Sequence, residues 1–209
     1  MKGSLKKNLI SAIVLVVCFA GAYAMKTMPM FTGTPYSISI DGYSVLPGET
    51  KVQDLAGQGY MLSDFKQKTF STTDMQYNYT GFYNLDTMAE ATTIYTGIDL
   101  VRDNENVASL YIMNASRQEK KLSECEVNTI ALWPSQLERV GYAVEGIPME
   151  ELTVEALTEK CGTFKNQSES QDDDGNPVTV TTWKKGKYSL ELRTKEDGTL
   201  DRVTSKYND

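Results

Sequence analysis

Three alternating segments near the C-terminus constrain the fold most strongly. They read PVTVTTW (177–183), KYSLELR (187–193) and LDRVTSKY (200–207). Apolar and polar residues alternate in each segment, which is the pattern of a half-buried β-strand. The connections, Lys184 to Lys187 and Glu196 to Gly198, are short and polar, so consecutive strands are expected to pair antiparallel. The sequence therefore predicts a C-terminal β-meander.

A short helix is predicted before this meander, in the stretch LTVEALTEKCGTF (152–164). Thr153 is a good N-cap, and Gly162 supplies the left-handed residue that commonly ends a helix. Leu157 and Cys161 lie one helical turn apart, so they are expected to share the packed side.

A second short helix is predicted earlier, in PGETKVQDLAGQGYML (47–62). Thr50 is expected to cap it, with Gln53 in the reciprocal capping position and Gly57 or Gly59 at its end. The two helices share one plan: a proline and glycine lead-in, a Val-x-x-Leu core pair, a glycine stop and then strands.

Strands are also predicted in the first part of the chain. In YSISIDGYSVL (36–46), apolar residues alternate on both sides of Asp41-Gly42, a strong signal for a hairpin with a two-residue turn. Further strands are expected at 75–83, 91–95, 107–114 and 125–133, separated by polar turns such as 103–106.

These elements predict an α+β fold of two small lobes, each a short helix packed on an antiparallel β-sheet. The first lobe spans 36–133, a polar connection spans 134–145, and the second lobe spans 146–209 and ends in the meander.

The N-terminus has the order of a secretory signal peptide. Three lysines precede an uncharged run from Leu9 to Ala24, which ends in Ala-Tyr-Ala. The run is 16 residues, at the short edge of the roughly 17 to 25 that span a bilayer. Cleavage after residue 24 is therefore favoured over retention as an anchor, and 25–35 is expected to be a tether. The protein should be extracytoplasmic, either secreted or attached to the outer face of the cytoplasmic membrane.

The charge of the chain argues against nucleic acid and anionic lipid as partners. The formal net charge is −7, and loss of residues 1–24, which hold three lysines and no acids, lowers it to −10. Such an acidic surface repels nucleic acid and anionic lipid. Contact with a membrane is therefore expected only through an uncleaved leader.

Two cysteines, Cys125 and Cys161, remain after the leader. In an exported protein they could form a disulfide, or they could be two separate buried thiols, which pack as small apolar residues. Their separation in sequence does not decide between these outcomes.

Four motifs carry a resemblance to known proteins: ISIDGYSVLPGETKVQDLAGQGYML, VASLYIMNASRQEKKLSECEVNTIAL, GIPMEELTVEALTEKCGTF and YSLELRTKEDGTLDRV. Together they resemble a group of uncharacterised exported proteins and lipoproteins of Gram-positive bacteria. The last two also resemble the repeat of β-lactamase-inhibitor-protein-like folds, in which a helix ending in glycine leads into a sheet finished by a turn such as 197–203. The resemblance implies a non-catalytic binding module or an envelope-associated module.

The residue types argue against an enzyme. Histidine is absent, which removes Ser-His-Asp and Cys-His catalysis and every histidine-based metal site. Ser63 and Lys66 match S-x-x-K, but the S-D-N and K-T-G elements that accompany it in penicillin-interacting families are missing.

The run Asp172-Asp173-Asp174-Gly175-Asn176 suggests calcium binding at first sight. Ser170 and Thr181, however, occupy the first and last positions of an EF-hand loop, where acids are needed. A hydrated hairpin loop is the better interpretation, and no metal or cofactor is expected.

Acids around the second helix, Glu150, Glu151, Glu155 and Glu159, could form a catalytic carboxylate pair. Such pairs act in enclosed pockets that shift their pKa values apart, and nothing apolar flanks these acids on the same side of the helix. A solvated side of a packed helix is the favoured interpretation.

The stretch MQYNYTGFYN (75–84) is the best candidate for binding. Tyr77, Tyr79, Phe82 and Tyr83 could form an aromatic row, and Trp133, Tyr142 and Trp183 add further rings. Large amphipathic rings suit interfaces, although cross-strand packing within the sheet also explains them.

The sequence thus predicts an exported, non-catalytic module of the bacterial envelope or medium that binds an unidentified protein or an envelope polymer. The alternatives are a carboxylate-dependent cell-wall hydrolase and a structural spacer held by an uncleaved leader.

Overall fold

The computed structural model describes residues 33–64, 68–71 and 76–208. The predicted leader (1–24), most of the tether (25–35) and Lys66 lie outside these residues.

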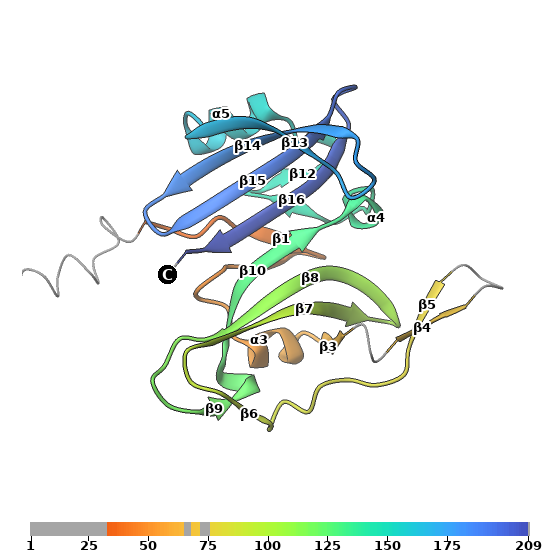
Figure 1. The fold of residues 1–209 in the computed structure, drawn as a ribbon, viewed down its shortest axis with the longest axis vertical. Coiled ribbons are helices and arrows are strands. Elements are labelled where there is room, and N and C mark those ends of the chain that lie inside the picture. The colour runs from red at the N-terminus through yellow and green to blue at the C-terminus, as the bar shows by residue number, and fades with distance from the viewer. Residues whose placement is uncertain (1–32, 65–67, 72–75, 209) are drawn as a thin grey trace, which may run out of the picture.

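One antiparallel sheet of eight strands runs through the molecule (Figure 1). The strands lie in the order β13 (Asn166–Gln171), β14 (Pro177–Lys185), β15 (Tyr188–Lys195), β16 (Leu200–Tyr207), β10 (Glu126–Leu132), β8 (Glu105–Asn114), β7 (Thr93–Arg102) and β3 (Met61–Asp64). The predicted meander is confirmed as β14, β15 and β16. Every residue of β13 is exposed, so no apolar alternation predicts that strand, and it is held through its backbone pairing with β14.

The same plan of a helix followed by four antiparallel strands occurs twice. Helix α3 (Val52–Gly57) precedes β3, β7, β8 and β10, and helix α5 (Val154–Cys161) precedes β13 to β16. The last strands of the two sets, β10 and β16, pair with each other at the centre of the sheet. The α+β class therefore holds in its coarse form, as mostly antiparallel β-structure with few, short helices. Strands from 36–133 and from 146–209 share one sheet.

A second sheet of four strands lies against the first (Figure 1). Its order is β12 (Ile147–Pro148), β11 (Ala143–Val144), β1 (Ile38–Ile40) and β2 (Tyr43–Val45). The predicted hairpin is confirmed: Ile40 pairs with Tyr43, and Asp41 and Gly42 take the positive φ values of 50° and 82° that a tight hairpin turn needs.

The remaining short elements are two small antiparallel strand pairs and three brief helices. They are β4 (Lys68–Ser71) with β5 (Gln76–Tyr79), β6 (Met88–Ala89) with β9 (Lys120–Lys121), and the helices η2 (Leu122–Glu124), α4 (Pro134–Leu137) and η3 (Met149–Glu151).

The two main helices begin differently. For α5 the prediction is confirmed, since the Thr153 hydroxyl accepts from the Ala156 N–H at 3.1 Å and Gly162 has a φ of 85°. For α3 the predicted cap is wrong: Lys51 is the N-cap, and its N–H donates to the Asp54 carboxylate at 2.9 Å. The Thr50 hydroxyl instead accepts from the N–H of Leu46, which closes the turn before the helix.

One continuous core joins both helices to both sheets. Val52 and Leu55 of α3 and Leu157 of α5 pack in it together with the inward side chains of the large sheet. The two cysteines are free thiols in the structure: Cys125 is buried and Cys161 is partly buried. They are two separate packing residues, at the start of β10 and at the end of α5.

Candidate functional site

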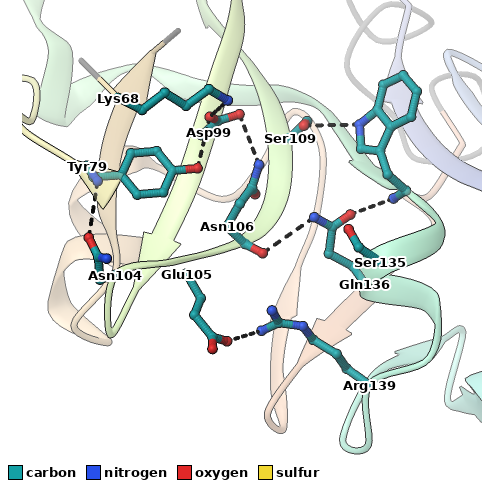
Figure 2. Close-up of a pocket in the computed structure, with 11 residues that line it drawn as sticks. Lys68, Tyr79, Asp99, Asn104, Glu105, Asn106, Ser109, Ser135, Gln136 and Arg139 are labelled. Carbon is teal, nitrogen blue, oxygen red and sulfur yellow. Dashed lines mark hydrogen bonds and ion pairs between the residues drawn. The ribbon is translucent and has the colours of Figure 1, made fainter. Parts of the chain in front are cut away.

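A polar pocket of about 430 Å³ lies where the β7–β8 turn, the β4–β5 pair and α4 meet (Figure 2). We call it the polar pocket. Its lining is Lys68, Tyr79, Asp99, Asn104, Glu105, Asn106, Ser109, Trp133, Ser135, Gln136 and Arg139. These residues come from separate stretches of the chain, so the fold, and no single motif, assembles the pocket.

The β7–β8 turn forms one wall of this pocket. Asp103 and Asn104 both have positive φ (52° and 63°), the geometry of a two-residue hairpin turn that these residue types tolerate. Arg102 therefore pairs directly with Glu105. The predicted polar turn at 103–106 is shorter than expected, because Glu105 and Asn106 already belong to β8 and point their side chains to the pocket (Figure 2).

Helix α4 forms the opposite wall, within the stretch predicted as a polar connection. Pro134 occupies the first helical position, and the Gln136 side chain accepts from the Trp133 N–H at 2.7 Å. Proline at this position and a glutamine two residues later are helix-start signals that could have predicted α4 from the sequence. The same glutamine donates to the carbonyl of Asn106 at 3.4 Å and so ties α4 to β8.

Asp99 is the carboxylate at the floor of the pocket, and its side chain is 10% exposed. One of its oxygens accepts from the Lys68 ammonium at 2.6 Å and from the Tyr79 hydroxyl at 3.0 Å. The other oxygen accepts from the Asn106 amide at 3.0 Å. A carboxylate with three hydrogen-bond partners has both oxygens engaged, which suits the positioning of neighbouring groups better than proton transfer.

The other acid of the lining is paired as well. Glu105 accepts from the Arg139 guanidinium at 2.8 Å. Nearby, the Trp133 indole donates to the Ser109 hydroxyl at 3.0 Å, and the Arg202 guanidinium lies 3.6 Å from the centre of the Trp133 ring. Arg202 itself is not among the lining residues of the pocket.

The predicted aromatic row is divided between two places. Tyr79 belongs to the polar pocket, and its ring stacks on Phe82 with 6.4 Å between centroids. Phe82 and Tyr83 line a separate apolar pocket of about 330 Å³ beside α3. Tyr77 lies in β5, and its side chain is outside the described part of the structure.

Tyr83 is anchored by chemistry of its own. Its hydroxyl donates to the Asp64 carboxylate at 2.7 Å, and its N–H donates to the carbonyl of Leu62, so residues beyond β5 run beside the edge strand β3. Burial, followed by the hydrogen bond to Asp64, raises the pKa of Tyr83 to about 12.

The other rings singled out in the sequence have different environments. Trp133 lines the polar pocket, a role that its sequence position alone does not indicate. Tyr142 and Trp183 are core residues; the Tyr142 hydroxyl donates to the carbonyl of Val107 and the Trp183 indole to that of Gly162.

The candidate acids of the second helix region do not converge. Glu150, Glu151, Glu155 and Glu159 are all exposed, and none of them lines the polar pocket or the apolar pocket beside α3. Among the described residues, Ser63 is also fully buried in β3, where its hydroxyl donates to the carbonyl of Gly81.

The acidic run at 172–176 is a hairpin loop between β13 and β14. Asp172 accepts from the Asn176 side chain and from the N–H groups of Asn176 and Asp174, and these hydrogen bonds, the side-chain one most of all, lower the pKa of Asp172. Within residues 33–64, 68–71 and 76–208, no cluster of three or more metal-ligating side chains occurs. In the same residues, no helix has the length and apolar character to cross a bilayer.

No protein-family profile matches this chain, and no curated protein matches it. Among solved structures, the chain is similar to the crystal structure of a DUF4309 family protein, YjgB, from Bacillus subtilis, with 18% sequence identity and a TM-score of 0.28. The match covers 51% of this chain and 68% of that chain. A similarity of this size carries no argument about function, so the functional argument rests on the pocket.

Proposed function

We propose that this chain is an exported, non-catalytic binding module of the Gram-positive cell envelope or medium, which holds a protein or an envelope polymer at the polar pocket. The proposal includes the two-lobed organisation and the resemblance to the β-lactamase-inhibitor-protein-like repeat. Export is supported by the order of charged, apolar and small residues in 1–24.

The observation that carries the binding role is the pairing of every charge in the described lining. Asp99 is bound by Lys68, and Glu105 by Arg139. A hydrolase needs one acid that can give a proton and one that can take it, in environments that separate their pKa values. Here both carboxylates are neutralised by cations, so the pocket offers fixed hydrogen-bonding groups and rings, which suit recognition.

Removal of Asp99 is a poor test, because it would take away the carboxylate that pairs with Lys68 at 2.6 Å, in a site where the lysine side chain is only 13% exposed. Ser135 is a better position. It is exposed on α4, lines the pocket, and its hydroxyl makes no hydrogen bond within the described part of the chain. Ser135→Trp would fill the pocket without breaking a contact. Val140→Trp is the matched control, since Val140 is 94% exposed and lies outside the lining.

The test is co-sedimentation of the protein with purified Gram-positive cell walls, and separately its capture of purified envelope proteins. Retention that falls at least about tenfold in Ser135→Trp and is unchanged in Val140→Trp supports the proposal. Equal retention by both variants, or no retention of the wild type on either material, overturns it. Release of soluble sugars from the walls would favour the hydrolase.

Export is tested separately by the intact mass of the protein in the medium and in the membrane fraction. A species that begins at Met25 in the medium supports a secreted module. A species that begins at Met1 in the membrane supports an anchored one, and a species confined to the cytoplasm contradicts both.

A further inference from the structure

We propose that the ligand of the polar pocket is an uncharged carbohydrate chain, and that it runs along the uncovered face of the large sheet toward a second hollow around Tyr111. This inference rests on the proposed function, because it names the class of polymer that the same pocket would hold.

The first argument is the composition of the pocket wall. Among the described residues that line it, none is aliphatic, and two are aromatic, Trp133 and Tyr79. A peptide ligand usually places an apolar side chain in an apolar socket. A sugar instead presents apolar C–H faces together with hydroxyl groups, which match rings surrounded by amides, a serine hydroxyl and fixed carboxylates.

The second argument is charge. The two cations and two acids of the lining cancel one another in close pairs, at 2.6 Å and 2.8 Å. A charged ligand would have to compete with these pairs and lose its own hydration. The chain as a whole is also acidic, with a formal net charge of −7, which disfavours phosphate-rich polymers. An uncharged ligand fits both facts.

The third argument is the continuity of the sheet face. Along β8, Ala108, Leu110 and Ile112 point into the core, so Ser109 and Tyr111 share the opposite face. Ser109 lines the polar pocket, and Tyr111 lines a second hollow of about 470 Å³. Same-face neighbours on a strand lie about 7 Å apart. The two hollows are therefore adjacent and could hold successive units of one chain.

The second hollow also combines apolar and polar side chains, but unlike the polar pocket its described lining includes an aliphatic residue, Ile94, and a single cation, Lys206. Tyr111 and Ile94 give it exposed apolar surface (40% and 49% exposed), and Lys206, Thr96 and Asn128 give it polar groups. Between the hollows, the register places Ser109 beside Ala131 and Ala131 beside Thr204. These small side chains keep the face shallow, so an extended chain can lie across it.

The experiment is calorimetric titration of the full chain with a hexamer of N-acetylglucosamine, a hexamer of glucose, poly(glycerol phosphate), and an uncharged hexapeptide of Gly, Ser and Gln. We expect at least one neutral sugar hexamer to bind, about tenfold or more tighter than its single sugar. Its affinity should change less than about twofold when salt is raised, because no ion pair forms.

Variants test where the carbohydrate lies on the protein. Ser135→Trp and Tyr111→Ala should each weaken binding of the hexamer, and Tyr111→Ala should leave the single sugar unchanged. Met88→Ala is the control, since Met88 is 52% exposed and lies outside both hollows. Equal binding in Tyr111→Ala overturns the extended path.

The two levels of the proposal fail differently. Suppose that retention on cell walls depends on Ser135, but that the protein binds the phosphate polymer or the peptide and neither sugar hexamer. That result overturns the carbohydrate assignment and leaves the proposed binding function intact. Absence of any retention overturns both.

Discussion

The two halves of the large sheet follow the same plan, yet the polar pocket belongs to one of them. Both halves begin with a short helix and continue with four antiparallel strands. In the second half, residues 172–176 connect the first two strands, whereas in the first half residues 65–92 do so. The described lining of the pocket comes from the first half, from α4 and from Arg139 just after α4, and none of it from the second half. The polar pocket therefore lies in the half whose first two strands are joined by the long connection.

The chemistry of the two connections explains this difference. In the second half, the Asp172 carboxylate bonds to the backbone of its own loop, so the turn is closed on itself. In the first half, the connection is long enough to carry a strand pair of its own. That pair delivers Lys68 and Tyr79 to Asp99, across the face of β7. A long connection with its own strands is typical of functional segments.

The largest expected effect tests whether the two halves form one folding unit. Trp183 of the second half is fully buried. Its ring packs edge-on against that of Phe164, with 6.2 Å between ring centroids, and its indole N–H donates to the carbonyl of Gly162 at 3.0 Å. Trp183→Ala should lower the free energy of unfolding by about 3 to 5 kcal/mol. Leu110→Ala is the matched change in the first half, at a residue that is also fully buried, with an expected loss of about 2 to 5 kcal/mol.

Urea unfolding followed by circular dichroism measures both changes. Because β10 pairs with β16, we expect each variant to show one transition, moved to lower urea with an unchanged slope. Two unfolding transitions, with each variant shifting only one of them, would show that the halves fold independently. That result would support the predicted organisation of two separate lobes.

A smaller expected effect is the pH dependence of the free energy of unfolding, which compares a tyrosine of the long connection with a tyrosine of the core. Burial raises the pKa values of Tyr83, in the connection, and Tyr142, in the core, to about 12 in the folded chain. An unfolded tyrosine ionises near pH 10. The stabilisation from each group is therefore complete below about pH 10 and is lost as the pH rises toward 12.

The free energy of unfolding should consequently fall between pH 10 and pH 12, and the fall should be shallower in Tyr83→Phe and in Tyr142→Phe. Urea midpoints measured at pH 9, 10, 11 and 12 give the slopes. A slope in Tyr83→Phe equal to that of the wild type would mean that the connection opens before Tyr83 ionises, and would place it outside the cooperative unit.

The sequence predicts the regular elements better than the site, for a physical reason. The meander, the Asp41-Gly42 hairpin and the α5 cap depend on local alternation and turn chemistry, and the structure confirms them. The β13 strand and the α3 cap are missed, because β13 has no apolar pattern and a lysine with a nearby aspartate replaces the usual capping side chain.

The pocket depends on contacts such as Lys68 with Asp99 and Trp133 with Ser109, which the sequence separates widely. Of its lining, Tyr79 and Trp133 were recognisable as candidate rings, but only the fold brings Asp99, Asn106 and Gln136 beside them.

The smallest expected effect compares the two cysteines and leaves stability unchanged. Cys125 lies between η2 and β10, is fully buried, and its thiol donates to the carbonyl of Lys121 at 3.5 Å. Cys161 lies at the end of α5 and is partly exposed. Burial raises the pKa of both thiols, so both react slowly at neutral pH, and access then decides which reacts first.

The third cysteine, Cys18, lies in the predicted leader and is replaced by serine so that it does not react. In this Cys18→Ser background, we expect an alkylating reagent at pH 8 to label Cys161 first, and to label Cys125 only at the rate at which the folded protein opens. Mass spectrometry of time points gives both rates, and addition of 6 to 8 M urea should make them similar. Simultaneous loss of both reactive thiols in the folded, non-reduced protein, reversed by a reductant, would instead show a disulfide between them. Such a bond would tie the residue just before β10 to the end of α5, and so add a covalent cross-link between the two halves, which the structure holds together by packing and strand pairing.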